Sequence, residues 1–355
     1  MAAVLVVGGG VIGCAAAERL TRDGHRVTLL ERDHLAGHAS GAAAGLLAPY
    51  TEASLPGRFL ELAERSFRMF PELAERVTAA SGIDVEHSEV EGMALAFDEA
   101  GDRRLREAAA WLPAPAEARL LAPGEARRLE PGLAPELAAA MLVRQARVTP
   151  ARLVRGLART AARGGAEIRE GSHVTALVTS GGAVSGVRLA GEAMRADWVV
   201  LAAGPWSQQL ALTAGVEVAV EPRRGQLVSL LPVEAPPGRV LTAGERYLVP
   251  RPDGTVIAGS TEEEVGFDAR PTAGAVLELL RFTAAAVPAL RRAALERVWA
   301  ALRPATRDGL PLIGPSACEN LVLATGHHRN GILLAPVTAE IVAQGLRGRW
   351  ESVPA

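Results

Sequence analysis

The first thirty-one residues constrain the fold more than any other part of the chain. Val4 to Val7 form a short apolar run, typical of a strand that is buried on both faces. Gly8, Gly10 and Gly13 follow it with the spacing G-x-G-x-x-G. In such a turn the first glycine bends the chain, the second lets backbone approach a pyrophosphate, and the third packs a helix on the strand.

A helix over about residues 12–23 and a second strand that ends in Glu31 complete the predicted unit. The helix directs its free N–H groups at a phosphate, and the acid is placed to hydrogen-bond a ribose diol. The pattern therefore predicts a dinucleotide site. An acid at position 31 repels a 2′-phosphate, which disfavours NADP and leaves FAD and NAD.

Composition excludes several other functions. The chain has 355 residues and a net charge of −2, so nothing suggests nucleic acid or an anionic membrane as a partner. All 38 basic residues are arginine, which excludes a Schiff-base lysine or a phosphate-loop lysine. Cys14 and Cys318 form no CxxC pair, no metal-ligand cluster stands out, and neither a signal peptide nor a membrane span is evident. These features predict a cytoplasmic protein in a reducing compartment.

Three later segments are expected to approach the same cofactor. Residues 38–49 are rich in small side chains, so a flat ligand can lie against their backbone. A predicted strand over 198–201 runs into Ala-Ala-Gly. Residues 327–332 form a polar turn before an apolar helix, and a positive helix end there would stabilise negative charge on a flavin. The alternative is a terminal helix capped by Asn330, with its two histidines on the surface.

The order of these segments predicts an α/β fold with two interleaved domains, because no linker-like tract divides the chain. We expect a Rossmann-type FAD-binding domain from residues 1–50, 145–215 and 305–355. Residues 51–144 and 216–304 would form an α+β substrate domain built on an antiparallel sheet. In that sheet, "PDG" is expected to make a hairpin turn.

Tyr247, Arg303 and Arg329 are the candidate substrate residues. Singly, each has an ordinary explanation, because tyrosines pack in strands and surface arginines are common. Together they suit an amino-acid carboxylate, which guanidinium groups grip in two places while a phenol donates another bond. Two or three such bonds, at about 1.5–3 kcal/mol each, supply most of the affinity for a small zwitterion.

The motifs "VVGGGVIG", "ASGAAAGLLAP", "RYLVPR", "LRPATRDGLPLIG" and "GHHRNGILLAP" resemble those of the D-amino-acid oxidase family of flavoenzymes, most of all its glycine oxidase branch. The resemblance covers nearly the whole chain. It implies non-covalent FAD, with Arg303 binding the substrate carboxylate, Tyr247 assisting and Arg329 near the same cavity. The motifs and the resemblance together place the cofactor contacts at Gly8, Gly10, Val11, Ile12, Gly13, Glu31, Arg32, Ser40, Ala43, Ala44, Gly45, Leu46, Val174, Ala203, Gly204, Trp206, Arg303, His328, Arg329, Asn330, Gly331, Ile332 and Leu333.

The resemblance also implies the reaction. A hydride passes from the α-carbon to the flavin without an obligatory side-chain base, and molecular oxygen restores the flavin and yields hydrogen peroxide. The imine hydrolyses to an oxo acid and ammonia, or supplies thiamine thiazole synthesis. A homo-oligomer is implied as well.

Two acids depart from the family pattern. Glu245 stands where a histidine can occur and Glu262 where an apolar residue is expected, so either could favour larger or basic amines if it faced the cavity. Three alternatives stay open: a D-amino-acid dehydrogenase that uses an electron carrier, an NAD-dependent dehydrogenase, and a flavin-binding module without catalysis.

Overall fold

The computed structural model describes residues 1–53 and 55–350. Among these residues, six strands form one sheet in the order β17-β18-β11-β1-β2-β7. Five of them run parallel, and β17 is antiparallel to β18 at the edge. Their bounds are β1 Ala3–Val7, β2 Arg26–Leu30, β7 Glu167–Arg169, β11 Trp198–Leu201, β17 Leu312–Pro315 and β18 Leu321–Thr325.

The central strand β1 is buried on both faces, as its continuous apolar run predicts. Val4 and Val6 face one hydrophobic core, and Leu5 and Val7 face another. Four helices cover the first face: α1 Val11–Arg22, α4 Arg58–Ser81, α7 Pro150–Arg163 and α10 Gly331–Leu346. Strands β8 Val174–Ser180 and β9 Ala183–Leu189, the short β10 Ala193–Arg195 and helix α8 Ser207–Leu212 lie on the other face.

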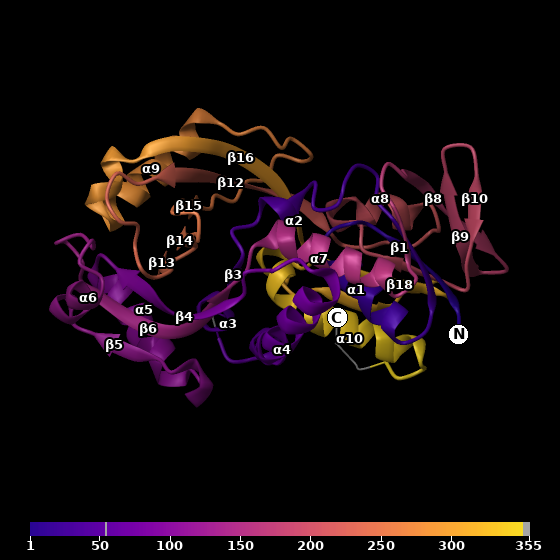
Figure 1. The fold of residues 1–355 in the computed structure, drawn as a ribbon, viewed down its shortest axis with the longest axis horizontal. Coiled ribbons are helices and arrows are strands. Elements are labelled where there is room, and N and C mark those ends of the chain that lie inside the picture. The colour runs from indigo at the N-terminus through magenta and orange to yellow at the C-terminus, as the bar shows by residue number, and fades with distance from the viewer. Residues whose placement is uncertain (54, 351–355) are drawn as a thin grey trace.

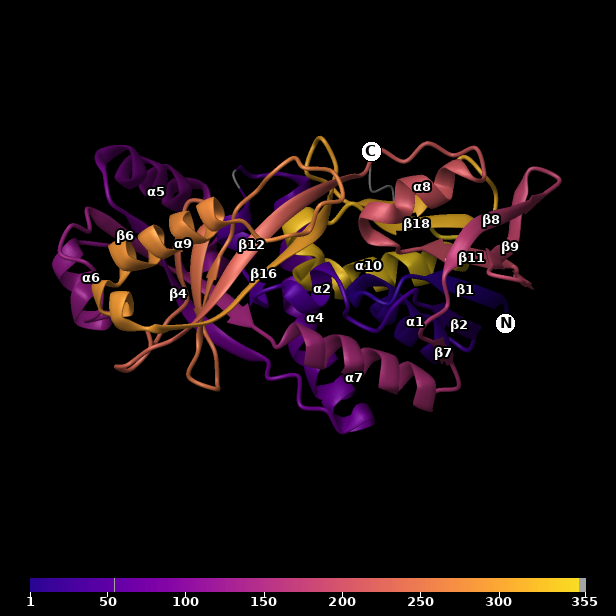
Figure 2. The ribbon, with the colours of Figure 1, turned by 90° about the horizontal axis from the view of Figure 1, so that it is seen from above.

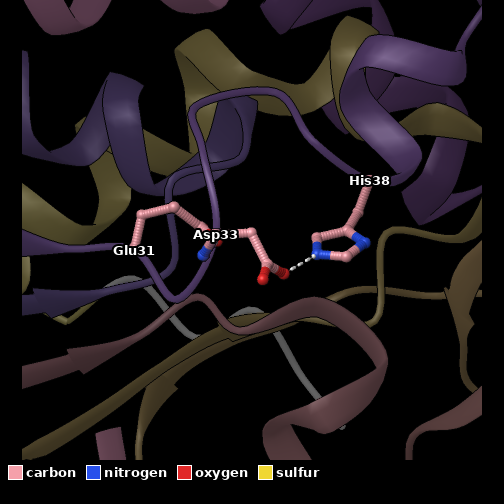
Figure 3. A group of neighbouring side chains, drawn as sticks. All are labelled: Glu31, Asp33 and His38. Atoms are coloured by element: carbon pink, nitrogen blue, oxygen red, sulfur yellow. Dashed lines mark hydrogen bonds and ion pairs between the residues drawn. The ribbon is translucent and has the colours of Figure 1, made fainter. Parts of the chain in front are cut away.

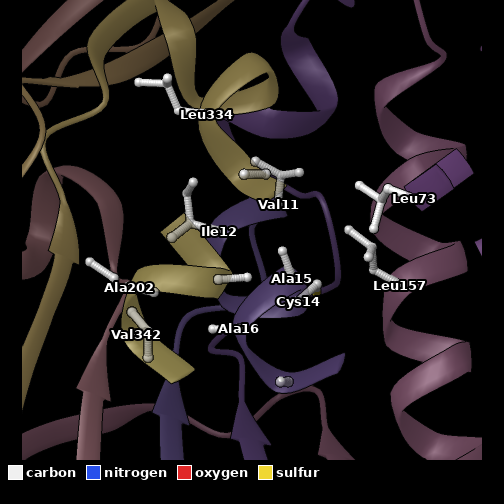
Figure 4. Packing of buried hydrophobic residues seen from close by; sticks show 14 of the residues in the cluster. Val11, Ile12, Cys14, Ala15, Ala16, Leu73, Leu157, Ala202, Leu334 and Val342 are labelled. Atoms are coloured by element: carbon white, nitrogen blue, oxygen red, sulfur yellow. The ribbon is translucent and has the colours of Figure 1, made fainter. Parts of the chain in front are cut away.

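Helix α1 packs at the centre of the helical layer. Figure 4 shows Val11 and Ile12 near Leu334 of α10, while Leu73 of α4 and Leu157 of α7 lie beyond the other side of the helix. Small residues along α1 allow this close packing. The other three helices hold α1 in a fixed direction relative to the sheet.

A second sheet forms the other end of the molecule (Figures 1 and 2). Among the described residues it has nine strands: β3 Leu46–Leu47, β4 Ser88–Ala96, β5 Arg119–Leu121, β6 Ala139–Arg147, β12 Glu221–Leu231, β13 Leu241–Ala243, β14 Arg246–Pro250, β15 Val256–Gly259 and β16 Ala294–Ala305. Three helices border it: α5 Glu99–Trp111, α6 Pro123–Leu129 and α9 Ala273–Ala286. The remaining short elements are α2 Ala39–Ala42, α3 Pro49–Glu52, η1 Ala114–Ala116, η2 Gly204–Trp206, η3 Pro288–Arg292 and η4 His328–Asn330.

The α/β fold class and the hairpin at "PDG" are confirmed: β14 and β15 are antiparallel across that turn. The larger sheet is not wholly antiparallel, however, because β13 runs parallel to β4. Strand β3, placed by the sequence within the cofactor segment 1–50, pairs with β6 in the larger sheet. The domain ranges themselves stay a prediction.

No helix within residues 1–53 or 55–350 combines the length and apolarity needed to cross a bilayer.

Replacing Leu20 tests the importance of α1 packing. Leu20 is fully buried in the core between α1 and its neighbours. Leu20→Ala is expected to lower the free energy of unfolding by about 2–5 kcal/mol, because it removes apolar contacts and leaves a cavity. Denaturant unfolding measures this change. Leu212→Ala, at a half-exposed leucine, should change stability by less than about 0.5 kcal/mol, and equal effects of the two would contradict the packing assigned to α1.

Candidate active site

The glycine turn after β1 permits two close backbone approaches. Gly8 has a φ of +115°, and a Cβ there would lie 2.3 Å from the Ala202 carbonyl oxygen. A Cβ on Gly13 would lie 1.9 Å from the Gly8 carbonyl oxygen, so α1 sits against the strand as the spacing predicts. Gly10, the residue before α1, provides no side-chain cap. The first turn of the helix therefore opens onto the space in front of it.

Glu31 is buried and held by backbone. Its Oε2 accepts a hydrogen bond from the Gly9 N–H at 2.6 Å, and Oε1 accepts one from the Asp33 N–H at 2.8 Å. Each carboxylate oxygen keeps a further lone pair. A ribose diol could use that remaining capacity.

Asp33 and His38 lie beside Glu31 (Figure 3), with ligand atoms close enough to surround a metal ion. Hydrogen bonds from His38 and Arg32 lower the pKa of Asp33. The Arg32 Nη2 lies 3.1 Å from His38 Nε2, and its guanidinium stacks over Trp206 at 4.3 Å. A cationic side chain thus already compensates the acids, and Glu31, Arg32 and His38 line the cavity together with Trp206.

The small-residue segment is anchored from both sides. The Val11 N–H donates to Ser40 Oγ at 2.9 Å. From the larger sheet, Trp299 Nε1 donates to the Ala42 carbonyl at 2.9 Å, and Arg251 Nη1 donates to the Ala44 carbonyl at 3.2 Å. The start of α1 on one side and side chains of β16 and the β14–β15 turn on the other therefore fix the backbone along which the cofactor is expected to lie.

These parts line one cavity of about 570 Å³, within the range of cofactor sites. Its lining includes all but two of the residues predicted from the sequence: Gly8, Gly10, Val11, Ile12, Glu31, Arg32, Ser40, Ala43, Ala44, Gly45, Leu46, Val174, Ala203, Gly204, Trp206, Tyr247, Arg303, His328, Arg329, Asn330, Gly331 and Ile332. Gly13 packs behind the turn instead. Leu333 is buried in the helical core, where its carbonyl accepts from Ser66.

The combination of a side-chain-free turn, a helix start without an N-cap side chain and an anchored small-residue wall fits a flavin dinucleotide. Among the further residues that line this cavity without having been singled out in the sequence are Gly9, His38, Glu52, Gly225 and Ser260. Gly9 and His38 stand inside the recognised motifs. The others come from positions that only tertiary pairing brings to the cavity.

Arg303 reaches the far end of the cavity from β16. Its Nη1 donates to the Thr261 carbonyl at 3.0 Å and its Nη2 to Ser260 Oγ at 2.6 Å. A Cβ on Gly225 of the neighbouring strand β12 would lie 2.2 Å from Nη2. Burial lowers the pKa of Arg303, and the nearby Arg329 charge adds to that shift.

Tyr247 and Arg329 meet Arg303 there. The ring of Tyr247 lies over Gly259 on β15, where a Cβ would approach the phenol oxygen to 2.7 Å. Arg329 Nε donates to Glu52 Oε2 at 3.2 Å and Nη2 to the Glu245 carbonyl at 2.7 Å, while the buried Nη1 makes no hydrogen bond. Burial lowers the pKa of Arg329, but Glu52, Tyr247 and Glu245 outweigh that effect and raise it.

The two acids that depart from the family pattern lie close to these arginines. Neither Glu245 nor Glu262 is among the lining residues. Glu262 Oε2 lies 2.8 Å from His328 Nε2 and 3.7 Å from Arg303 Nη1. Glu245 is largely exposed, with Oε2 3.8 Å from Arg329 Nη1.

The polar turn before α10 faces the cavity through His328, Asn330 and Gly331. Asn330 precedes the helix but makes no side-chain cap. The alternative with both histidines on the surface is wrong for His327, which is 2% exposed and lies 2.9 Å from Thr338 Oγ1 through Nε2. The turn therefore presents the uncapped, positive end of α10 to the cavity.

Comparisons with known proteins match nearly the whole chain. The model of the DAO family, described as FAD dependent oxidoreductase, matches residues 3–345. The glycine oxidase of Pseudomonas putida is 36% identical and is covered to 94% of its length by 97% of this chain. The crystal structure of glycine oxidase from Geobacillus kaustophilus superposes with a TM-score of 0.93 at 33% identity, over 100% of this chain and 97% of that one.

The bifunctional protein ThiO/ThiG of a Nostoc species is 34% identical over 96% of this chain. The chain spans about half of that relative's length, 52%.

The buried His327 predicts a pH dependence of stability. Burial lowers its pKa to about 3, whereas an unfolded histidine titrates near 6.5, so between these values the unfolded state binds more protons. The stability that this residue contributes is complete above about pH 6.5 and falls as the pH drops. Between pH 7 and pH 5, unfolding measurements should show a loss of about 2 kcal/mol in the native protein that is missing in His327→Gln. His34→Gln, at an exposed histidine, should keep the native dependence; an unchanged dependence in His327→Gln would count against the assignment.

Proposed function

The chain belongs to the DAO family of FAD-dependent oxidoreductases, and on this premise we propose that it is a flavoprotein oxidase of glycine and other small amines or D-amino acids. Glycine, water and oxygen would give glyoxylate, ammonia and hydrogen peroxide. Relatives of similar length that carry the name glycine oxidase support the substrate class.

One observation carries the proposal: Tyr247, Arg303 and Arg329 meet at one end of the cavity that begins at the glycine turn. Their origin in three separate segments argues against coincidence. A phenol and two guanidinium groups suit a carboxylate. The unbonded Nη1 of Arg329 is a buried donor for which such a ligand would provide the acceptor.

The residues of this chain would position the substrate and control charge. When bound, FAD supplies the two-electron acceptor for the hydrogen removed from the substrate carbon. Arg303 and Tyr247 hold the carboxylate, which directs the amine end back along the cavity toward the small-residue wall. The uncapped end of α10 favours negative charge on the group that it faces, as a preorganised dipole. Burial lowers the pKa of His328. The neutral ring donates a hydrogen bond from its Nε2–H to the Glu262 carboxylate, so it does not bind the carboxylate of the substrate.

Further parts of the proposal rest on the family. Oxygen as the electron acceptor follows the oxidase names of the relatives, and the ThiO/ThiG match supports a role in thiamine thiazole synthesis. Non-covalent binding of FAD agrees with Cys318, whose Sγ donates to the Gly182 carbonyl away from the lining residues. A homo-oligomer and a cytoplasmic location stay predictions. The NAD alternative loses its support, since the family is FAD-dependent.

The visible spectrum of the purified protein tests the reaction. Without oxygen, glycine, sarcosine or D-alanine should bleach the flavin bands, and readmitted air should restore them with release of hydrogen peroxide. Restoration only by an added electron carrier would indicate a dehydrogenase. A yellow protein that no amine reduces would contradict the substrate class and favour a flavin-binding module.

Arg303→Ala should raise KM for glycine on the order of a hundredfold, for a loss of about 3 kcal/mol in binding, while FAD remains bound. The reason is the loss of a two-point contact with the carboxylate. Steady-state peroxide assays give KM, and the flavin absorbance per chain reports the cofactor. Arg307→Ala, at an exposed arginine four residues along, is the matched control. An unchanged KM in Arg303→Ala would remove this arginine from the site.

A further inference from the structure

Three carboxylates surround the two arginines at the substrate end. Glu52 lines the cavity and pairs with Arg329 at 3.2 Å. Glu245, which is largely exposed, lies 3.8 Å from the same arginine. Glu262 lies 3.7 Å from Arg303.

These charges do not cancel. Three acids against two guanidinium groups leave one negative charge in excess before any substrate enters. His328, which contacts Glu262, does not restore the balance, because burial lowers its pKa and keeps the ring neutral. A zwitterionic amino acid brings no net charge, and its carboxylate finds donors on Arg303 and Arg329. If the substrate has a second carboxylate, both arginines are already bonded to the first one. The second carboxylate is then repelled by the negative charges of the three acids.

We propose that Glu52, Glu245 and Glu262 make this cavity select its substrates by charge, so that it accepts amines with one carboxylate and rejects those with a second. The inference rests on the proposed function and specifies its substrate class. Repulsion of the wrong ligand gives selectivity that attraction of the right one alone does not.

Glu262 carries the largest part of this selection. Its side chain is one-third exposed and contacts two side chains that line the cavity, so its charge is only partly screened. The charge of Glu52 is largely compensated by its ion pair with Arg329. Glu245 is three-quarters exposed, and solvent and salt weaken its field.

Pairs of acid and amide compounds test the proposal, because the two members have the same size. Iminodiacetate is compared with its monoamide, and D-aspartate with D-asparagine, as substrates of the FAD-loaded enzyme. Where a compound is not oxidised, its inhibition constant against glycine is measured instead. In at least one pair the amide should be favoured on the order of tenfold or more, equivalent to at least about 1.4 kcal/mol. Equal values within both pairs would overturn the proposal.

The variant Glu262→Gln tests whether Glu262 causes the difference between acid and amide. It removes the charge but keeps the shape, and it should reduce the acid–amide difference severalfold, while glycine remains a substrate. Glu264→Gln is the matched control, since Glu264 is exposed and pairs with Arg223. Equal changes in the two variants would show that Glu262 is not the selecting acid. Flavin absorbance and thermal unfolding confirm that both variants are loaded and folded.

Different results would contradict the proposed oxidase function and the proposed charge selection. If glycine does not reduce the flavin, the proposed function fails, yet acid and amide binding can still be compared through the shift of the flavin spectrum. If glycine is oxidised but acid and amide behave alike, only the charge selection fails.

Discussion

The contact between Gly13 and the Gly8 carbonyl oxygen is the constraint on which the cofactor end of the structure depends. It sets the distance between α1 and β1, and no side chain fits at position 13. Because α4, α7 and α10 then pack around α1, its direction is fixed by a large core rather than by the turn alone. The helix start, to which Gly10 adds no side chain, is therefore held in place before a ligand arrives, and binding costs little reorganisation.

The substrate end is organised by a different force, the desolvation of charged groups. Buried guanidinium groups are stable only where acceptors surround them. Arg303 uses the Thr261 carbonyl and Ser260, and Arg329 uses Glu52 and the Glu245 carbonyl. These bonds fix the directions of the remaining donors, so the same contacts that make burial tolerable also preorganise the site.

The sequence predicted the cofactor half well because its signals are local. Strand periodicity, glycine spacing and the acid at position 31 lie within one βαβ unit, and helix α10 begins within two residues of its predicted start. The substrate half depends on long-range pairing. Nothing near Glu52 in sequence indicates that it will face Arg329, 277 residues away. Gly225 is needed only because Arg303 occupies the adjacent strand.

The two predictions that were wrong, for Leu333 and His327, also depended on contacts that the local sequence does not show. Leu333 follows a lining residue, yet on a helix one step in sequence turns a side chain by about 100°, and this one points into the core. His327 looked suited to the surface because its motif is polar. Its burial depends on a contact with Thr338, eleven residues further along the chain in helix α10, which the local pattern does not reveal.

The hydrogen bonds from Trp299 and Arg251 to the carbonyls of Ala42 and Ala44 have a thermodynamic consequence. They tie the sheet that carries Arg303 to the wall against which the dinucleotide is expected to lie. Any amine that tightens this junction must raise the affinity for the dinucleotide by the same factor as the dinucleotide raises the affinity for the amine. Such a linkage would pass through these two hydrogen bonds, and each dissociation constant would then depend on whether the other site is filled.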